Sequence, residues 1–134
     1  MKPKLFRVTT VPESLRILLN GQHKFMSENG FDVIGVSTAG NVLQEVSQDE
    51  KIRVIEIKMS RKITLINDFI SMYNLYKVMK KEKPIIVHSH TPKAGIVSML
   101  AAKLSNVPIR LHTVAGLPLM EARGPKRLLL NFVE

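Results

Sequence analysis

The sequence of 134 residues contains no cysteine and no tryptophan, and aromatic residues make up only 5% of it. Without cysteine, the chain has neither disulfides nor a thiolate ligand or nucleophile. The scarcity of aromatic side chains, and the lack of a basic stretch interleaved with them, argue against nucleic-acid binding. No segment approaches the roughly 18–20 apolar residues of a membrane span, and the first residues lack the apolar run of a signal peptide. We therefore expect a soluble, cytoplasmic protein that is at most peripheral to a membrane.

Several catalytic and cofactor-binding motifs are also missing. The turn after the first expected strand reads Thr-Thr-Val-Pro-Glu-Ser (9–14), so it lacks the Gly-x-Gly-x-x-Gly of a dinucleotide site. Neither a phosphate-binding P-loop nor a Gly-x-Ser-x-Gly nucleophile motif occurs. His88 and His90 would project to one face of a strand, with His112 on another strand, but no third ligand or supporting carboxylate lies nearby in the sequence. We therefore predict no metal site and no bound cofactor.

The charge that is present is mostly positive. Twenty Lys and Arg against eleven Asp and Glu give a net charge of +9. Such a surface favours anionic partners such as phosphates or an acidic membrane face, although a solvated basic surface without a specific partner fits equally well. The length suits one domain, and the 45% apolar and 23% charged content is ordinary for a globular protein.

The most informative stretch is residues 83–95, Lys-Pro-Ile-Ile-Val-His-Ser-His-Thr-Pro-Lys-Ala-Gly. Its β-branched run predicts a strand that is buried on both faces, and the polar residues 88–91 follow where that strand ends. Thr91 and Pro92 suit the N-cap and first position of a helix. The stretch therefore predicts a strand, a polar tip and a helix N-terminus, and in parallel sheets ligands bind at that edge.

Strand and helix patterns alternate along the whole chain. Strand patterns cover residues 5–10, 31–37, 52–57, 85–89 and 109–113, and helical patterns cover 15–29, 42–48, 63–81, 92–105 and 126–134. The helix over 15–29 contains Gly21, which suggests close packing there, and Gln22, which we expect to be a buried amide. This alternation predicts an α/β fold, a three-layer α/β/α sandwich around a mainly parallel sheet of about five strands.

The polar loops after the strands should meet at the carboxyl edge of this sheet. Histidines, a lysine and helix N-termini at such an edge would suit phosphate and sugar hydroxyls. Of the histidines, His90 lies nearer the tip, whereas His88 also fits a packed strand residue. Asp68 and Glu82 are expected to be solvent-facing helix charges.

The last helical pattern remains apolar up to the final residues, with neither a cap nor a charged tail. We therefore expect the sequence to be a fragment. An exposed final helix and a bare inter-domain face would allow such a fragment to form a homodimer.

Three segments resemble the N-terminal domain of glycosyltransferase family 4, the retaining sugar transferases of bacterial polysaccharide assembly. They are residues 84–95, residues 100–110 (Leu-Ala-Ala-Lys-Leu-Ser-Asn-Val-Pro-Ile-Arg) and residues 113–118 (Thr-Val-Ala-Gly-Leu-Pro). The first loop and helix, from Val11-Pro12 to Gly21-Gln22, are similar as well. The likeness runs along nearly the whole chain.

This resemblance implies one half of a GT-B-type fold, in which two Rossmann-like domains enclose a cleft. Residues 1–134 would be the N-terminal domain, which receives the acceptor, often a lipid-linked diphosphate sugar. The missing C-terminal domain would hold most of the nucleotide-sugar donor and the paired-glutamate motif of the family. The fragment alone would then be inactive.

The resemblance also implies which residues lie in the site. The family often has Thr-x-His-Gly after the fifth strand, but this chain has Thr113-Val114-Ala115-Gly116. His90 and His112 are therefore the candidate catalytic residues. The apolar loop 117–120, flanked by basic residues, would suit an acceptor at an anionic membrane, or it packs on a missing domain. The expected acceptor-binding residues are Pro12, Ser14, His88, His90, Thr91, Lys93, Gly116, Glu121 and Arg123.

Two other functions stay open at this point. A sugar-nucleotide epimerase of similar architecture would need no acceptor. A non-enzymatic α/β binding module would be complete at 134 residues.

Overall fold

The computed structural model describes residues 2–60, 62 and 64–114. Their centre is a five-stranded, wholly parallel sheet with the order β3-β2-β1-β4-β5. The strands are β1 (Lys4–Val8), β2 (Asp32–Ser37), β3 (Arg53–Glu56), β4 (Ile86–Ser89) and β5 (Ile109–His112). The strand order reverses between β1 and β4, which makes their carboxyl ends the topological switch point. The predicted parallel α/β fold is confirmed.

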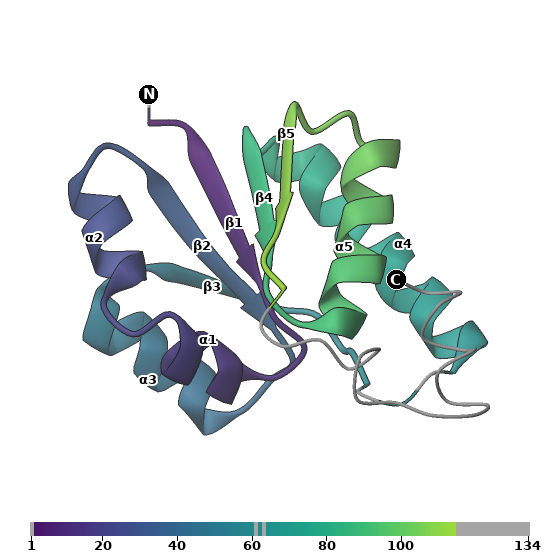
Figure 1. Cartoon of the computed structure of the whole chain (residues 1–134), viewed down its shortest axis with the longest axis horizontal. Coiled ribbons are helices and arrows are strands. Elements are labelled where there is room, and N and C mark those ends of the chain that lie inside the picture. Colours follow the sequence, from purple (N-terminus) through teal and green to yellow (C-terminus); the bar gives the residue numbers. More distant parts are fainter. Residues whose placement is uncertain (1, 61, 63, 115–134) are drawn as a thin grey trace.

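Helices cover both faces of the sheet (Figure 1). On one face lie α1 (Pro12–Leu18), α2 (Gln22–Glu28) and α3 (Asn41–Glu50), and on the other lie α4 (Leu65–Glu82) and α5 (Pro92–Leu104). Both α1 and α5 begin with proline, whose fixed φ suits the first helical position. Left-handed residues end α3 and α4, at Lys51 and Lys83.

The single helix expected over residues 15–29 is wrong, because two short helices occupy this segment. Gly21 has a φ of +80°, and the amide of Gln22 donates to the carbonyl of Leu19 in a turn between the helices. A Cβ on Gly21 would meet nothing within 4 Å, so its backbone angle, not close packing, calls for glycine. Gln22 is exposed, contrary to the expected buried amide.

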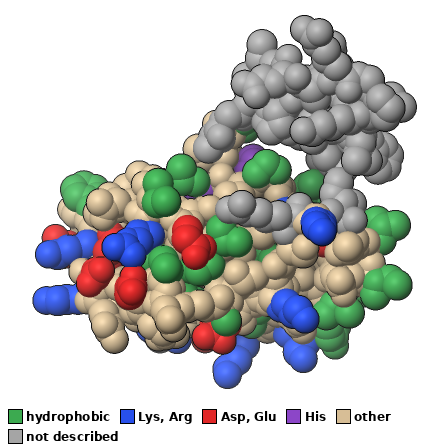
Figure 2. Space-filling view, turned by 90° about the horizontal axis from the view of Figure 1, so that it is seen from below, with side chains coloured by type: hydrophobic (Ala, Val, Ile, Leu, Met, Phe, Trp, Pro, Cys, Tyr) green, Lys and Arg blue, Asp and Glu red, His purple; other side chains and the backbone are tan. Residues whose placement is uncertain are grey.

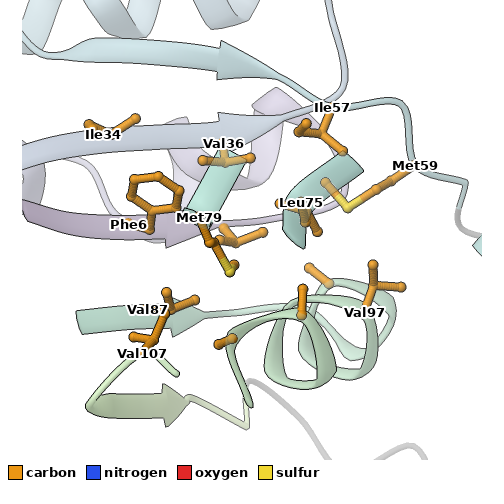
Figure 3. Packing of buried hydrophobic residues seen from close by; sticks show 14 residues of the cluster. Phe6, Ile34, Val36, Ile57, Met59, Leu75, Met79, Val87, Val97 and Val107 are labelled. Carbon is orange, nitrogen blue, oxygen red and sulfur yellow. The ribbon is translucent and has the colours of Figure 1, made fainter. Parts of the chain in front are cut away.

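The larger hydrophobic core lies between the sheet and the α4–α5 layer (Figure 3). Phe6 of the central strand is fully buried, and it lies among strand residues such as Ile34 and Val87 and helix residues such as Met79. Two smaller clusters, containing Leu5 and Leu15, fill the space between the other face and α1–α3. Burial of one such side chain contributes about 1.5–3 kcal/mol.

The long helix α4 is buried along a narrower face than its apolar pattern indicates. Leu75 and Met79 face the core, and so does Ser71, whose hydroxyl donates to the Lys58 carbonyl 2.5 Å away. Large apolar side chains toward its N-terminal end are instead 51–82% exposed: Leu65, Ile66, Phe69, Ile70 and Tyr73. We call these five residues the α4 apolar face. Within residues 2–60, 62 and 64–114, no helix combines the length and hydropathy needed to cross a membrane.

Candidate functional site

The loops that follow β1 and β4 are joined at the carboxyl edge of the sheet. The Thr91 hydroxyl accepts a hydrogen bond from the Thr10 amide at 3.1 Å and lies 2.9 Å from the Thr10 hydroxyl. The amide of His90 donates to the carbonyl of Val8 at 3.1 Å. Thr91 is the N-cap of α5 by position, but its side chain bonds to the β1 loop and makes no capping hydrogen bond. The structure thus brings the β1 and β4 tips together, as predicted from the topology.

A polar cluster lies beside this junction, on the face of the sheet that carries α1 and α2. The imidazoles of His88 and His90 stack with their centroids 4.1 Å apart. The Nη1 atom of Arg7 lies 3.3 Å from Nε2 of His90 and 3.4 Å from the side-chain oxygen of Gln22. Nε2 of His88 lies 2.6 Å from the hydroxyl of Thr113, just beyond β5. Residues from the ends of β1, β4 and β5 therefore meet here.

Both imidazoles of the cluster are neutral at neutral pH. Burial lowers the pKa of His88 to about 4, with the Arg7 cation as the next cause. Burial also lowers the pKa of His90 to about 3, followed by the effects of His88 and Arg7. His90 is only 4% exposed, while His88 is half-buried, so the expectation that His90 is the freer of the two is wrong. The His90 ring is buried against Arg7 and does not face outward.

His112 lies on the opposite face of the sheet from this cluster. It pairs in register with Ser89, so the two side chains project together, and Nδ1 of His112 lies 2.7 Å from the Ser89 hydroxyl. Its ring packs on Gly95 of α5, where a Cβ would come within 2.5 Å of Cε1. The two candidate catalytic histidines therefore face different layers. The part of the chain that the structure describes holds no group of three His, Asp or Glu side chains that could bind a metal ion.

Lys93, an expected acceptor-binding residue, is engaged inside the domain. It is 8% exposed, and its Nζ lies 2.7 and 2.8 Å from the two carboxylate oxygens of Asp68 in α4. The same carboxylate accepts a hydrogen bond from the Thr64 amide at 3.3 Å. Asp68 is therefore not the solvent-facing charge that we expected, because it ties the N-terminus of α4 to that of α5. Glu82 differs too, since it pairs with Arg53 at 2.6 Å.

The first loop is arranged by packing. Pro12 is buried, and a Cβ on Gly40 would lie 3.4 Å from its Cγ atom. Ser14 is half-buried in the first turn of α1, where its amide donates to the Val11 carbonyl at 3.2 Å. Gly116, Glu121, Arg123, the loop 117–120 and the helix expected over 126–134 lie outside the described residues. The acceptor-binding roles of all these residues remain predictions.

Arg7 is the residue of the cluster that the sequence reasoning overlooked. It occupies the first strand, between Phe6 and Val8, and its side chain is 6% exposed. A charged residue within a β-branched and aromatic run was the available signal, because such a residue is buried only with polar partners or a function.

Comparisons with known proteins identify the family of this chain. The chain belongs to the glycosyl transferase 4-like family, whose profile matches residues 7–134. The capsular polysaccharide biosynthesis glycosyltransferase CapM of Staphylococcus aureus is 38% identical over 131 residues, which are 98% of this chain and 33% of that protein. The UDP-Gal:alpha-D-GlcNAc-diphosphoundecaprenol alpha-1,3-galactosyltransferase of Escherichia coli is 45% identical over 69 residues, 51% of this chain and 18% of that one.

Solved structures share the fold. A putative UDP-N-acetylglucosamine 2-epimerase from Listeria monocytogenes has a TM-score of 0.67 and 19% identity, with 99% of this chain and 37% of that one covered. A glycosyltransferase from Rickettsia africae has a TM-score of 0.66 and 23% identity, with 87% of this chain and 30% of that one covered. The chain thus has the Rossmann-like architecture of one half of a GT-B-type protein, and it spans about a third of the curated relative that it matches over its length.

Proposed function

We propose that this chain is the acceptor-side, N-terminal domain of a retaining, nucleotide-sugar-dependent glycosyltransferase that builds bacterial capsular or surface polysaccharide in the cytoplasm. The family match over residues 7–134 carries the proposal, and the identity with CapM supports it. A second, C-terminal domain would hold most of the sugar nucleotide. The acceptor would be a saccharide or a lipid-linked sugar, as the name of the galactosyltransferase relative suggests.

In this proposal the domain positions the acceptor for the reaction. Neutral imidazoles and threonine hydroxyls at the carboxyl edge are suited to hydrogen bonds with sugar hydroxyls. They would hold one acceptor hydroxyl beside the anomeric carbon of the donor, on the face from which the diphosphate leaves, as retention of configuration requires. The acceptor oxygen would bond to that carbon and lose its proton, while the nucleotide leaves as its diphosphate. Stabilisation of the departing charge would come mainly from the second domain.

The test is an assay of the complete protein with radiolabelled sugar nucleotides. We expect label to enter an acceptor such as N-acetylglucosaminyl-diphosphate on a short prenol, and none to enter when the acceptor is left out. The 134-residue chain alone should transfer nothing, because most of the donor site would be missing. Transfer by the isolated chain would contradict the two-domain proposal.

A sugar-nucleotide epimerase is the second candidate, and the fold similarity to the Listeria protein favours it. At 19% identity this similarity reaches only the fold, whereas the sequence relatives are glycosyltransferases. The same assay separates the two functions. Epimerised sugar nucleotide formed without acceptor would replace the transferase proposal.

We also propose peripheral attachment to an anionic membrane, through the α4 apolar face. Its large side chains are exposed together on one side of a helix, and lysines follow on the same helix, with Lys77 over the Tyr73 ring at 5.3 Å. The two carboxylates of α4 are engaged elsewhere, Asp68 by Lys93 and Glu82 by Arg53. Hydrophobic side chains and Lys or Arg side chains are both visible on the α4–α5 side of the molecule, at the right of Figure 2. An apolar face beside cations is typical of helices that lie in the headgroup region.

Replacing Phe69 by glutamate should weaken vesicle binding at least tenfold. The change removes apolar area that would be buried in the membrane, and it adds a negative charge that the anionic lipids repel. Flotation with vesicles of 30% phosphatidylglycerol, compared with neutral vesicles, measures this. The matched control is Ile17→Glu on α1, a side chain that is 75% exposed on the other layer. Equal binding by both variants would contradict the proposal. A dimer in sedimentation that Phe69→Glu dissociates would assign the face to self-association instead.

A further inference from the structure

Arg7 is a buried cation without a carboxylate partner among the described residues. In these ranges (2–60, 62 and 64–114) it makes no ion pair within 4.0 Å, and its Nε atom is buried without a hydrogen bond. Burial lowers the pKa of Arg7. The negative charge of Glu50, which is not in contact with it, raises the pKa by a smaller amount. The Glu50 carboxylate itself is directed to the Lys24 amide, at 3.4 Å, and to His23, at 3.7 Å.

The contacts that Arg7 makes offset little of the cost of burying its positive charge. Both Nη1 contacts, to Gln22 and His90, are 3.3–3.4 Å long, against about 2.9 Å for a typical N–H···O bond. Their acceptors are neutral, and a buried charge without a hydrogen-bonded counter-charge is costly. The site is therefore incomplete in electrostatic terms, and an anion would complete it.

Polar contacts lead from the buried guanidinium of Arg7, through His90 and His88, to Thr113 at the surface. Arg7 is in register with His88 of β4, whose half-buried ring leads to the exposed Thr113. The helices of this face, α1 and α2, pack over β2, whereas α5 packs on β4 and β5 from the opposite face. Arg7 thus lies at the switch point of the sheet, where ligands bind in open α/β folds.

We propose that Arg7, together with the ring nitrogens of His88 and His90, binds a phosphoryl group of the substrate. The proposal rests on the proposed function, in which the donor carries a diphosphate and a lipid-linked acceptor carries one as well. The planar guanidinium matches two phosphate oxygens, and imidazole N–H groups can donate to others. The ligand class is an organic diphosphate, from either the nucleotide sugar or the lipid-linked acceptor.

The first experiment measures binding of inorganic pyrophosphate to the chain by calorimetry and by the shift in Tm. We expect Arg7→Met to weaken binding at least tenfold and to remove the pyrophosphate-induced rise in Tm. Without anion, Arg7→Met should unfold at the wild-type temperature or above, because it removes an uncompensated charge. The matched control is Arg53→Gln at the amino end of β3, an exposed cation whose loss should leave pyrophosphate binding unchanged.

An equal response to pyrophosphate in wild type and Arg7→Met would overturn the proposal, as would a wild-type chain that shows no response. A marked loss of Tm in Arg7→Met without anion would also overturn it, because Arg7 would then be stabilised within the fold itself.

A second experiment uses the complete protein and identifies the source of the phosphoryl group. A rise in KM for the prenyl-diphosphate acceptor alone in Arg7→Met would assign the acceptor, and a rise for the sugar nucleotide alone would assign the donor. Unchanged KM values in an active enzyme would reject the Arg7 site while the transferase function stands. A wild-type protein that lacks transfer activity but binds pyrophosphate through Arg7 would reject the function and keep the site.

Discussion

Replacing Asp68 by alanine should lower the free energy of unfolding by about 2–4 kcal/mol. The change leaves Lys93, whose side chain is 8% exposed in the wild-type fold, without its carboxylate partner. Breaking a buried ion pair from one side costs about 3–5 kcal/mol, and the 21% exposure of Asp68 moderates that value. Urea denaturation of the chain, followed by circular dichroism, measures the effect.

A double replacement separates the pair from the rest of the fold. Asp68→Leu with Lys93→Met should recover most of the lost stability, because it removes both charges and keeps apolar volume between α4 and α5. Asp49→Ala, at an exposed carboxylate near the end of α3, is the matched control and should change stability by less than about 0.5 kcal/mol. If Asp68→Ala matched this control, the ion pair would not hold the two helix ends together.

Most of the fold could be predicted from the sequence because its strands carry strong local signals. The β-branched run before His88 is continuous, and Pro92 fixes the start of α5, so β4 and its tip were predicted within a residue or two. Gly21 was misread, because sequence alone does not tell a packed helical glycine from one that needs a positive φ. The apolar pattern of α4 likewise cannot tell which part faces the core and which faces outward.

The candidate site was predicted in its position and missed in its detail. The meeting of the strand ends follows from a parallel topology, and alternation along one strand places His88 and His90 together. The face on which His112 lies depends on its register with Ser89 of another strand, which no local pattern specifies. The contacts of Lys93 and Arg7 could not be predicted for the same reason. Their partners, Asp68 and His90, are distant from them in the sequence.

The second large effect that we expect concerns His88 in the complete protein. His88 is the half-buried imidazole of the carboxyl edge, and Thr113 contacts its Nε2. If the acceptor binds at this edge, His88→Ala removes a hydrogen-bonding group from the acceptor site. It also removes the ring that stacks on His90, so the acceptor hydroxyl is held less firmly. Losing one such bond is worth about 1.4 kcal/mol, or tenfold in rate, and misplacement of the hydroxyl adds to it. We expect a decrease in kcat/KM of ten- to a hundredfold.

The direct test of acceptor binding at the carboxyl edge is kcat/KM for the acceptor in His88→Ala, measured at saturating sugar nucleotide. The control is Lys103→Ala, an exposed residue in the last turn of α5, at the other end of the sheet. We predict a decrease of at least tenfold for His88→Ala, with a Tm close to that of the wild type. A value of kcat/KM equal to that of Lys103→Ala would contradict acceptor binding at the ends of β1, β4 and β5.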